Sequence, residues 1–257
     1  MSLLSYNVIG EGLPVVFLHG FLENQAIWAY QLEKLSASYK CVTIDLPGHG
    51  KSEYKIDKLN FFKLAEQVFE VLDHLGIEKC TVIGHSMGGY IGLHMAKLNQ
   101  KRISKLCLMN SHANKDSKQK KIDRDRALKV IEKHYEVFVK EAIPNLFYYK
   151  NHEKCEKDIA FLIEEALKMD PKVVKEYTLA MKKRKSRLRF ITKSKIPLWY
   201  ILGNRDTVVP RDEIQDQIVY TKGELRVVSE TAHMSYYEDR YQTLNVISEI
   251  LESKRGL

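Results

Sequence analysis

The sequence contains no long hydrophobic run. A helix that crosses a bilayer needs about 20 apolar residues, and no run of even about 18 occurs in the 257-residue chain. We therefore expect no membrane span. The start, Met1 to Asn7, lacks both a basic region and a long apolar segment, so we also expect no secretory signal.

Cysteine is scarce, and its spacing does not suggest a metal site. The chain has four cysteines, none of them in a C-x-x-C pair. Three lie in expected strands, Cys41, Cys80 and Cys107, and the fourth, Cys155, lies outside them. We expect buried free thiols rather than disulfides or metal ligands. Free thiols favour a reducing compartment, so we expect a cytoplasmic location.

A phosphate-binding loop is also absent. The loop from Asp45 to Ser52 is rich in glycine and contains Pro47, so it resembles such a loop at first sight. It lacks the G-x-x-x-x-G-K-[ST] spacing, and no helical pattern begins directly after it. We do not expect phosphate to bind there.

Basic residues are unevenly distributed and concentrate in one segment. The chain carries a formal net charge of +8, but residues 115–195 hold 23 Lys and Arg against 13 Asp and Glu, a net of +10. The rest of the chain therefore has a formal net charge of −2. The basic excess belongs to a single segment and says little about the rest of the chain.

Short apolar runs alternate with helical patterns along most of the chain. A chain of this length can bury the core of one α/β domain, and the alternation predicts a mostly parallel, doubly wound sheet. The first two strands are expected to form a hairpin through Gly10-Glu11-Gly12. Strands are expected at 3–9, 14–19, 40–44, 80–83, 103–109, 196–202 and 224–229, and helices at 25–36, 61–75, 87–95, 210–219 and 235–251.

The segment 112–195 interrupts this alternation. It has helical patterns near 121–142, 153–169 and 171–185, with breaks at Pro144 and Pro171, and no convincing strand. We therefore expect an all-helical cap at 112–195, inserted into an α/β core formed by 1–111 and 196–257.

The most informative motif is G-x-S-x-G at Gly84, Ser86 and Gly88. An apolar strand precedes it and a helical pattern follows it, which is the context of a nucleophile elbow. A sharp turn would hold the Ser86 hydroxyl clear of the backbone, and the glycines would avoid collisions beside it. Backbone N–H groups at the start of the helix would point at the same place.

Five polar residues follow directly after expected strands. In an open α/β sheet the site lies at the carboxyl ends of the strands, so these side chains should converge. A nucleophilic serine needs a base, and the base needs an orienting acid. The five residues are His19, Ser86, Asn110, Asp206 and His233.

Other titratable residues offer alternatives. Asp212 could replace Asp206 as the acid, but it lies inside an expected helix. His49, His85 and His94 are interpreted as structural, with His85 directed into the sheet.

Several motifs together resemble the α/β-hydrolase-fold superfamily, in its branch of cap-bearing, carboxylesterase-like serine hydrolases. The order Ser, Asp, His is the order of that fold. The resemblance covers about residues 5–111 and 196–252 and leaves out the insertion. The matching pieces are His19-Gly20-Phe21 with Trp28, Asp45-Leu46-Pro47-Gly48-His49-Gly50-Lys51-Ser52, Gly84-His85-Ser86-Met87-Gly88-Gly89, Leu202-Gly203-Asn204-Arg205-Asp206 and Ala232-His233.

The resemblance implies a catalytic triad. Ser86 would be the nucleophile, His233 the general base and then acid, and Asp206 the residue that orients His233. The backbone N–H groups of Phe21 and Met87 would bind the oxyanion. The implied reaction is hydrolysis of a small ester or thioester through an acyl-enzyme, without a metal or organic cofactor.

The cap of this family lies over the substrate pocket, which suggests candidate contacts. Residues considered as substrate contacts are His19, Trp28, Tyr90, Phe147 and Tyr148, with Phe138 and Tyr149 as further pocket walls. His19 also fits a structural hydrogen-bonding role, and Trp28 a place in the core. The aromatic residues of the cap could equally pack the cap on the core.

The basic run from Lys182 to Arg189 has three interpretations. It could be a solvated helix face, a surface that attracts an anionic substrate such as a coenzyme A thioester or a carboxylate, or a surface for nucleic acid or membrane. No recognised nucleic-acid module accompanies it, and we expect no nucleic-acid partner. The sequence sets no oligomeric state.

Other functions can use the same residues. The sequence is also similar to the cap-bearing lyase that eliminates pyruvate in menaquinone synthesis, although Tyr90 stands where such relatives often carry Arg. A ligand receptor with slow turnover, C–C bond hydrolysis and perhydrolysis remain open. A haloalkane dehalogenase is disfavoured, because it needs a carboxylate where Ser86 stands.

Overall fold

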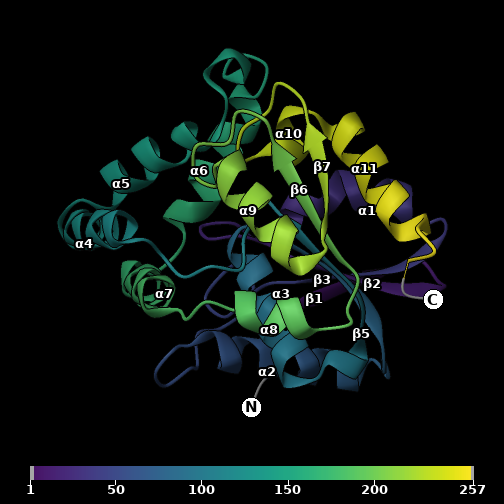
Figure 1. Cartoon of the computed structure of the whole chain (residues 1–257). Helices are drawn as coiled ribbons and strands as arrows, with labels where there is room; N and C mark the ends of the chain where they lie inside the picture. Colours follow the sequence, from purple (N-terminus) through teal and green to yellow (C-terminus); the bar gives the residue numbers. More distant parts are fainter. Residues whose placement is uncertain (1–2, 256–257) are drawn as a thin grey trace.

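One seven-stranded sheet forms the centre of the molecule (Figure 1). The computed structural model describes residues 3–255. The strand order is β1-β3-β2-β4-β5-β6-β7, and every neighbouring pair is parallel except β1 with β3. The strands are β1 (Tyr6–Ile9), β2 (Leu13–Leu18), β3 (Tyr39–Ile44), β4 (Cys80–His85), β5 (Ile103–Met109), β6 (Leu198–Gly203) and β7 (Glu224–Val228). The expected doubly wound, mostly parallel sheet is confirmed.

Helices cover both faces of the sheet (Figure 1). One face carries α1 (Ala29–Leu35) and α11 (Arg240–Glu252), and the other carries α2 (Phe61–His74), α3 (Met87–Leu98) and α8 (Leu188–Lys193). The remaining helices are α4 (Lys118–Lys133), α5 (Tyr135–Ala142), α6 (Glu156–Leu167), α7 (Pro171–Lys183), α9 (Arg211–Thr221), α10 (Ser235–Glu238) and the short 3-10 turns η1 (Gln25–Trp28), η2 (Gln100–Arg102), η3 (Pro144–Leu146) and η4 (Tyr149–Asn151). None of the helices within residues 3–255 is long and apolar enough to cross a bilayer.

Strands buried on both faces explain the continuous apolar runs in the sequence. Every residue of β4 and of β6 is buried. Alternate residues enter two separate cores: Val16 and Leu18 pack with α2 and α3, whereas Val15 and Phe17 pack with α1 and α11. This rigid centre is what holds the ends of β4, β6 and β7 in place.

The expected hairpin of the first two strands is wrong. β1 pairs with β3, with Tyr6 opposite Ile44 and Ile9 opposite Cys41. β2 has no free edge for β1, because β3 and β4 pair with its two sides. The residues between β1 and β2, Gly10 to Gly12, therefore make a connection rather than a hairpin turn.

The segment between β5 and β6 contains the helices α4 to α8 and no strand among its residues, as expected. The expected helix over 121–142 is interrupted at His134, whose φ of −146° and ψ of 56° are not helical. The expected break at Pro171 is the start of α7, which Asp170 caps, because its side chain accepts from the Lys172 N–H at 2.8 Å. α8 was not expected. The division of the chain at 111/112 and 195/196 remains a prediction.

The last expected helix, 235–251, is two helices. Asp239, with φ −144° and ψ 87°, ends α10, and its side chain caps α11 by accepting from the Gln242 N–H at 2.8 Å. This break at Asp239 lies shortly after His233, the residue that follows β7 and enters the site.

Candidate active site

Ser86 lies at a sharp turn between β4 and α3. Its backbone has φ 48° and ψ −110°, a strained conformation for a non-glycine residue. A Cβ on Gly84 would lie 2.4 Å from the Gly88 backbone, and a Cβ on Gly88 would lie 2.2 Å from the Leu18 carbonyl oxygen. The glycines are therefore required by close packing of backbone on backbone, as the motif predicts.

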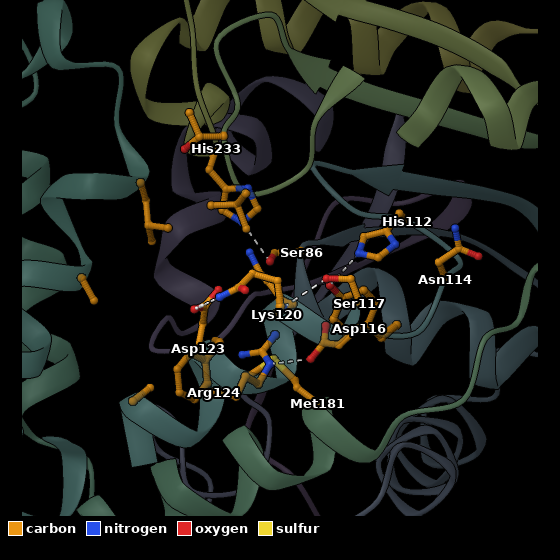
Figure 2. Close-up of a pocket in the computed structure, with 18 of the residues that line it drawn as sticks. Ser86, His112, Asn114, Asp116, Ser117, Lys120, Asp123, Arg124, Met181 and His233 are labelled. Atoms are coloured by element: carbon orange, nitrogen blue, oxygen red, sulfur yellow. Dashed lines mark hydrogen bonds and ion pairs between the residues drawn. The ribbon is translucent and has the colours of Figure 1, made fainter. Parts of the chain in front are cut away.

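Ser86, His233 and Asp206 form a hydrogen-bonded chain. The Ser86 Oγ lies 2.9 Å from His233 Nε2, and His233 Nδ1 lies 2.9 Å from Asp206 Oδ2. Figure 2 shows the contact between Ser86 and His233. Because the carboxylate only accepts, Nδ1 carries the proton and Nε2 is free to accept from the serine hydroxyl. The three residues come from the ends of β4, β7 and β6.

The Asp206 carboxylate is buried and fully hydrogen-bonded. Its Oδ1 accepts from the backbone N–H groups of Val208 and Val209 at 2.8 and 3.0 Å. Burial acts to raise the pKa of Asp206, but the charge of His233 and the hydrogen bonds outweigh it, and the net shift is downward. Asp206 is therefore held as an anion beside His233.

Asn110 supports the acid, a role that the sequence reading missed. Its side-chain amide donates to Asp206 Oδ2 at 2.9 Å and to the Ala232 carbonyl at 3.0 Å, and accepts from the Ser235 hydroxyl at 2.9 Å. It sits at the end of β5 with φ 46°, a conformation that Asn tolerates better than most residues. Its place at the end of a strand was the signal: Asn110 was among the polar residues expected to converge, but no role was assigned to it.

A buried ion pair lies directly under the triad. His85 Nδ1 lies 3.0 Å from Glu23 Oε2, and His85 Nε2 lies 2.9 Å from the His233 carbonyl oxygen. Both partners are acceptors, so both ring nitrogens donate and His85 is an imidazolium. Burial acts to lower the pKa of His85, but the Glu23 charge raises it above its ordinary value.

Glu23 connects this pair to the loop after β2. Burial acts to raise its pKa, yet the His85 charge and hydrogen bonds lower it below its ordinary value. The same carboxylate accepts from the Gly20 N–H at 2.6 Å. The pair therefore fixes both the loop that carries Phe21 and the backbone of His233. The structural role expected for His85 fits this contact, whereas Glu23 was not singled out from the sequence.

The two expected oxyanion donors reach Ser86 in different ways. Met87 follows Ser86 in the chain as the first residue of α3, and Phe21 lines the same cavity as Ser86. In the described part of the chain, neither backbone N–H donates to a protein acceptor. Their role stays a prediction.

A cavity of about 950 Å³ opens onto Ser86 and His233. It lies between the sheet and helices α4, α5 and α7. Its lining contains both apolar and charged residues. The apolar residues include Leu22, Ala127, Phe138, Leu146, Met181 and Val208, and the charged residues include Asp116, Lys120, Asp123, Arg124 and Glu213.

Of the five expected substrate contacts, one lines the cavity and four do not. Tyr90 lines the cavity. His19 and Trp28 have no exposed surface: His19 accepts from the Leu46 N–H at 3.0 Å, and Trp28 packs between Phe17 and Tyr236. A substrate contact is therefore wrong for these two residues, which have the structural and core roles considered as alternatives.

The two aromatic residues of the cap do not line the cavity either. Phe147 is buried against Tyr237, and Tyr148 stacks edge-on against Tyr149 on the side of η4. They pack the inserted segment on the core, which was the alternative interpretation. Phe138, considered only as a further pocket wall, does line the cavity.

Half of the basic run is engaged within the protein. Arg184 is buried, forms an ion pair with Asp116, and lies with its guanidinium 4.0 Å from the centre of the Tyr90 ring. Lys182 pairs with Asp125, and Arg187 donates to His94 Nε2 at 2.8 Å. The run is thus neither a wholly solvated face nor a continuous anion-binding surface.

All four cysteines are buried free thiols, as expected. Burial raises the pKa of Cys41 to about 11 and of Cys80 to about 12. Within residues 3–255, no group of three or more His, Cys, Asp or Glu side chains could hold a metal ion.

Comparison with known proteins agrees with this architecture. The family model for the alpha/beta hydrolase fold matches residues 14–147. Among curated proteins, the chain is 39% identical over 103 residues to the dihydrolipoyllysine-residue acetyltransferase component of the acetoin cleaving system of Pseudomonas putida, a match that covers 40% of this chain and 28% of the relative. It is 23% identical to the AB hydrolase superfamily protein YisY of Bacillus subtilis, over 95% of this chain and 94% of that protein. Epoxide hydrolase 4 of Homo sapiens is 36% identical over 109 residues, covering 41% of this chain and 30% of the relative.

Solved structures share the whole fold. A thermophilic esterase from Thermogutta terrifontis aligns with a TM-score of 0.91 and 24% identity over 99% of this chain and 94% of that chain. The enol-lactonase from Burkholderia xenovorans aligns with a TM-score of 0.89 and 20% identity over 97% and 96%. The chain spans less than a third of the length of the first curated relatives that it matches.

Proposed function

The chain belongs to the α/β hydrolase fold family, and we propose that it is a serine hydrolase that cleaves a small ester or thioester through an acyl-enzyme on Ser86. The observation that carries this proposal is the hydrogen-bonded chain of Ser86, His233 and Asp206 at the floor of the cavity. A nucleophile, a base and an orienting acid in that order have the geometry that acyl transfer to water needs.

In the proposed reaction, His233 Nε2 accepts the Ser86 proton while Oγ attacks the carbonyl carbon. The tetrahedral intermediate collapses, the carbon–oxygen or carbon–sulfur bond breaks, and His233 returns the proton to the leaving alcohol or thiol. A water molecule then attacks the acyl-enzyme, with His233 again taking and returning one proton. Asp206 holds the Nδ1–H tautomer and stabilises the imidazolium in both steps.

Phe21 and Met87 are proposed to stabilise the charge that develops on the carbonyl oxygen. Their N–H groups have no competing protein acceptor in the described chain, and the start of α3 adds a favourable dipole. Loss of one donor of this kind costs a factor of about 10²–10³ in kcat. A lactone would react by the same steps, and the fold shared with an enol-lactonase is consistent with this variant.

The first test is labelling of the wild type and Ser86→Ala with a fluorophosphonate probe, combined with hydrolysis of p-nitrophenyl esters of increasing chain length. We expect labelling and turnover in the wild type and neither in Ser86→Ala. Ser38→Ala, which changes an exposed serine, is the matched control and should behave as the wild type. Ester hydrolysis by Ser86→Ala at the wild-type rate would overturn the proposal.

A further inference from the structure

Several of the charged residues that line the cavity come from the loop before α4 and from the first turns of α4. Asp116 is a buried anion among them, and two guanidinium groups share it: Arg184 contacts Oδ1, and Arg124 Nε lies 2.7 Å from Oδ2. Burial acts to raise the pKa of Asp116, but the two arginines lower it below its ordinary value. One carboxylate thus faces two fixed cations, while Asp123 and Glu213 add further carboxylates to the lining.

Lys120 adds a third cation, and its side chain has no partner. Within residues 3–255, no hydrogen bond or ion pair joins its amine to the protein, although its backbone N–H donates to Ser117. The nearby carboxylate of Asp123 is engaged instead by Gln119 at 3.0 Å and by Arg126. Lys120 is only partly exposed, unlike the fully solvated lysines that need no counter-charge.

The amine of Lys120 lies on the side of the cavity where the reaction would occur. Figure 2 shows its side chain directed toward Ser86 and His233, and all three residues line the same cavity. Burial and the charge of Arg124 lower the pKa of Lys120, while Asp116 and the triad residue Asp206 oppose the shift.

An ammonium group in a partly dehydrated cavity is stabilised when an anion supplies charge and hydrogen bonds. Asp116, Asp206 and Asp123 act on the charge of Lys120, but within residues 3–255 none of them hydrogen-bonds to its amine, so an anion of the substrate is the remaining hydrogen-bond partner. Its anionic group must be near the bond that is cleaved, because Lys120 and Ser86 face the same space. Apolar residues that line the same cavity, such as Ala127 and Phe138, suit a short hydrocarbon portion.

We propose that Lys120 binds a carboxylate of the substrate, and that the enzyme acts on esters or lactones that carry a free carboxylate a few carbons from the scissile carbonyl. This inference rests on the proposed hydrolase function and narrows its substrate class. Lys120 is then a specificity residue that attracts and orients the acyl portion. Arg124 and Arg184 are held by Asp116 and are not available to the substrate in the same way.

The test compares two p-nitrophenyl esters that differ in one charge: p-nitrophenyl hydrogen succinate and p-nitrophenyl methyl succinate. We expect the wild type to favour the anionic ester in kcat/KM, and Lys120→Met to reduce that preference by about tenfold or more. Lys118→Met removes an exposed lysine from the same helix and should keep the preference. Lys120→Arg should retain most of it. An unchanged preference in Lys120→Met would overturn the inference.

A binding measurement separates this inference from the hydrolase proposal. Calorimetric titration with succinate should show binding that Lys120→Met weakens by about tenfold and Lys118→Met leaves unchanged. Succinamide, which is neutral, should not distinguish the variants. If neither ester is cleaved, the hydrolase proposal fails while succinate binding still decides the role of Lys120. If esters are cleaved but succinate binds both lysine variants equally, the hydrolase stands and the role of Lys120 is rejected.

Discussion

At the scale of single residues, hydrogen-bond partners distinguish the two buried histidines behind the nucleophile. His233 has a carboxylate at Nδ1 and a hydroxyl, which can donate or accept, at Nε2, whereas His85 has acceptors on both sides and must donate twice. The partners of His85 thus fix it as a charged imidazole. The two rings are 5.0 Å apart, so the charge on His85 also needs Glu23 as its counter-ion.

Glu23→Gln tests this arrangement. The amide keeps the shape of the side chain but removes the counter-charge, so His85 should lose its second proton and one of its two donors. Removing one partner of a buried ion pair costs about 3–5 kcal/mol of stability. We expect a lower melting temperature, and a decrease in kcat that exceeds any change in KM, because the backbone of His233 loses its fixed position.

Glu33→Gln is the matched control, since Glu33 lies on the exposed side of α1. It should leave melting temperature and kinetics unchanged. The contradicting outcome is a Glu23→Gln variant with a lower melting temperature but the kcat of the wild type, measured at a temperature where the variant is folded. The ion pair would then stabilise the fold without positioning His233.

The sequence allowed the reacting residues to be predicted, but not the residues that hold them. Ser86, Asp206 and His233 follow three strands and carry recognisable motifs, so their convergence could be foreseen. Asn110 and Glu23 act through contacts between segments up to 125 positions apart, as in the bond from Ser235 to Asn110. No local pattern encodes such contacts, because they depend on how the elements pack.

At the scale of elements, the turn from β4 to α3 is fixed by backbone contacts. Gly88→Ala would place a methyl group 2.2 Å from the Leu18 carbonyl oxygen, which belongs to the neighbouring strand. The sheet cannot yield there, so we expect a large loss of stability and loss of probe labelling at Ser86.

Gly76→Ala separates steric collision from backbone strain. Gly76 has φ 64° and nothing within 4 Å of an added Cβ. The change should cost only the strain of the left-handed conformation, about 1 kcal/mol. Chemical denaturation of both variants measures the difference. Equal costs would mean that collision with Leu18 is not what constrains the elbow.

The predicted helix boundaries were wrong where the chain breaks a helix without a glycine or proline. His134 divides one expected helix and Asp239 another, and neither residue type marks a break reliably. The pairing of β1 failed for a different reason, because proximity in sequence favours a hairpin with β2. Competition for the edges of β2, which β3 and β4 occupy, is visible only in the assembled sheet.

At the scale of the whole molecule, the inserted helices are joined to the core through a histidine that must stay neutral. His94 of α3 donates through Nδ1 to the Tyr90 carbonyl at 2.7 Å and accepts through Nε2 from Arg187. Arg187 can only donate, so protonation of His94 would break the contact. Burial, aided by the charge of Arg187, lowers the pKa of His94 to about 4.

This contact predicts how stability depends on pH. Between the ordinary pKa of histidine and about 4, the unfolded chain binds a proton at His94 that the folded chain does not, so stability is present above about pH 6.5 and falls as the pH decreases. The loss from this residue should approach about 3 kcal/mol near pH 4. Burial also lowers the pKa of His19 and His49, which adds in the same direction.

Urea denaturation across this pH range checks the prediction. His94→Gln should flatten the dependence, whereas His134→Gln, which changes an exposed histidine, should leave the slope as in the wild type. A slope that is the same in all three proteins would show that His94 is not the coupled group.

The buried thiols make the chain convenient for spectroscopy. Their raised pKa values leave almost no thiolate near neutral pH, so a maleimide or methanethiosulfonate reagent should spare them. A cysteine introduced at the exposed position Val137 of α5, paired with one at Val219 of α9, would then be the only reactive pair among the described residues. Spin labels there would turn the distance between the inserted helices and the core into a direct readout of opening and closing during turnover.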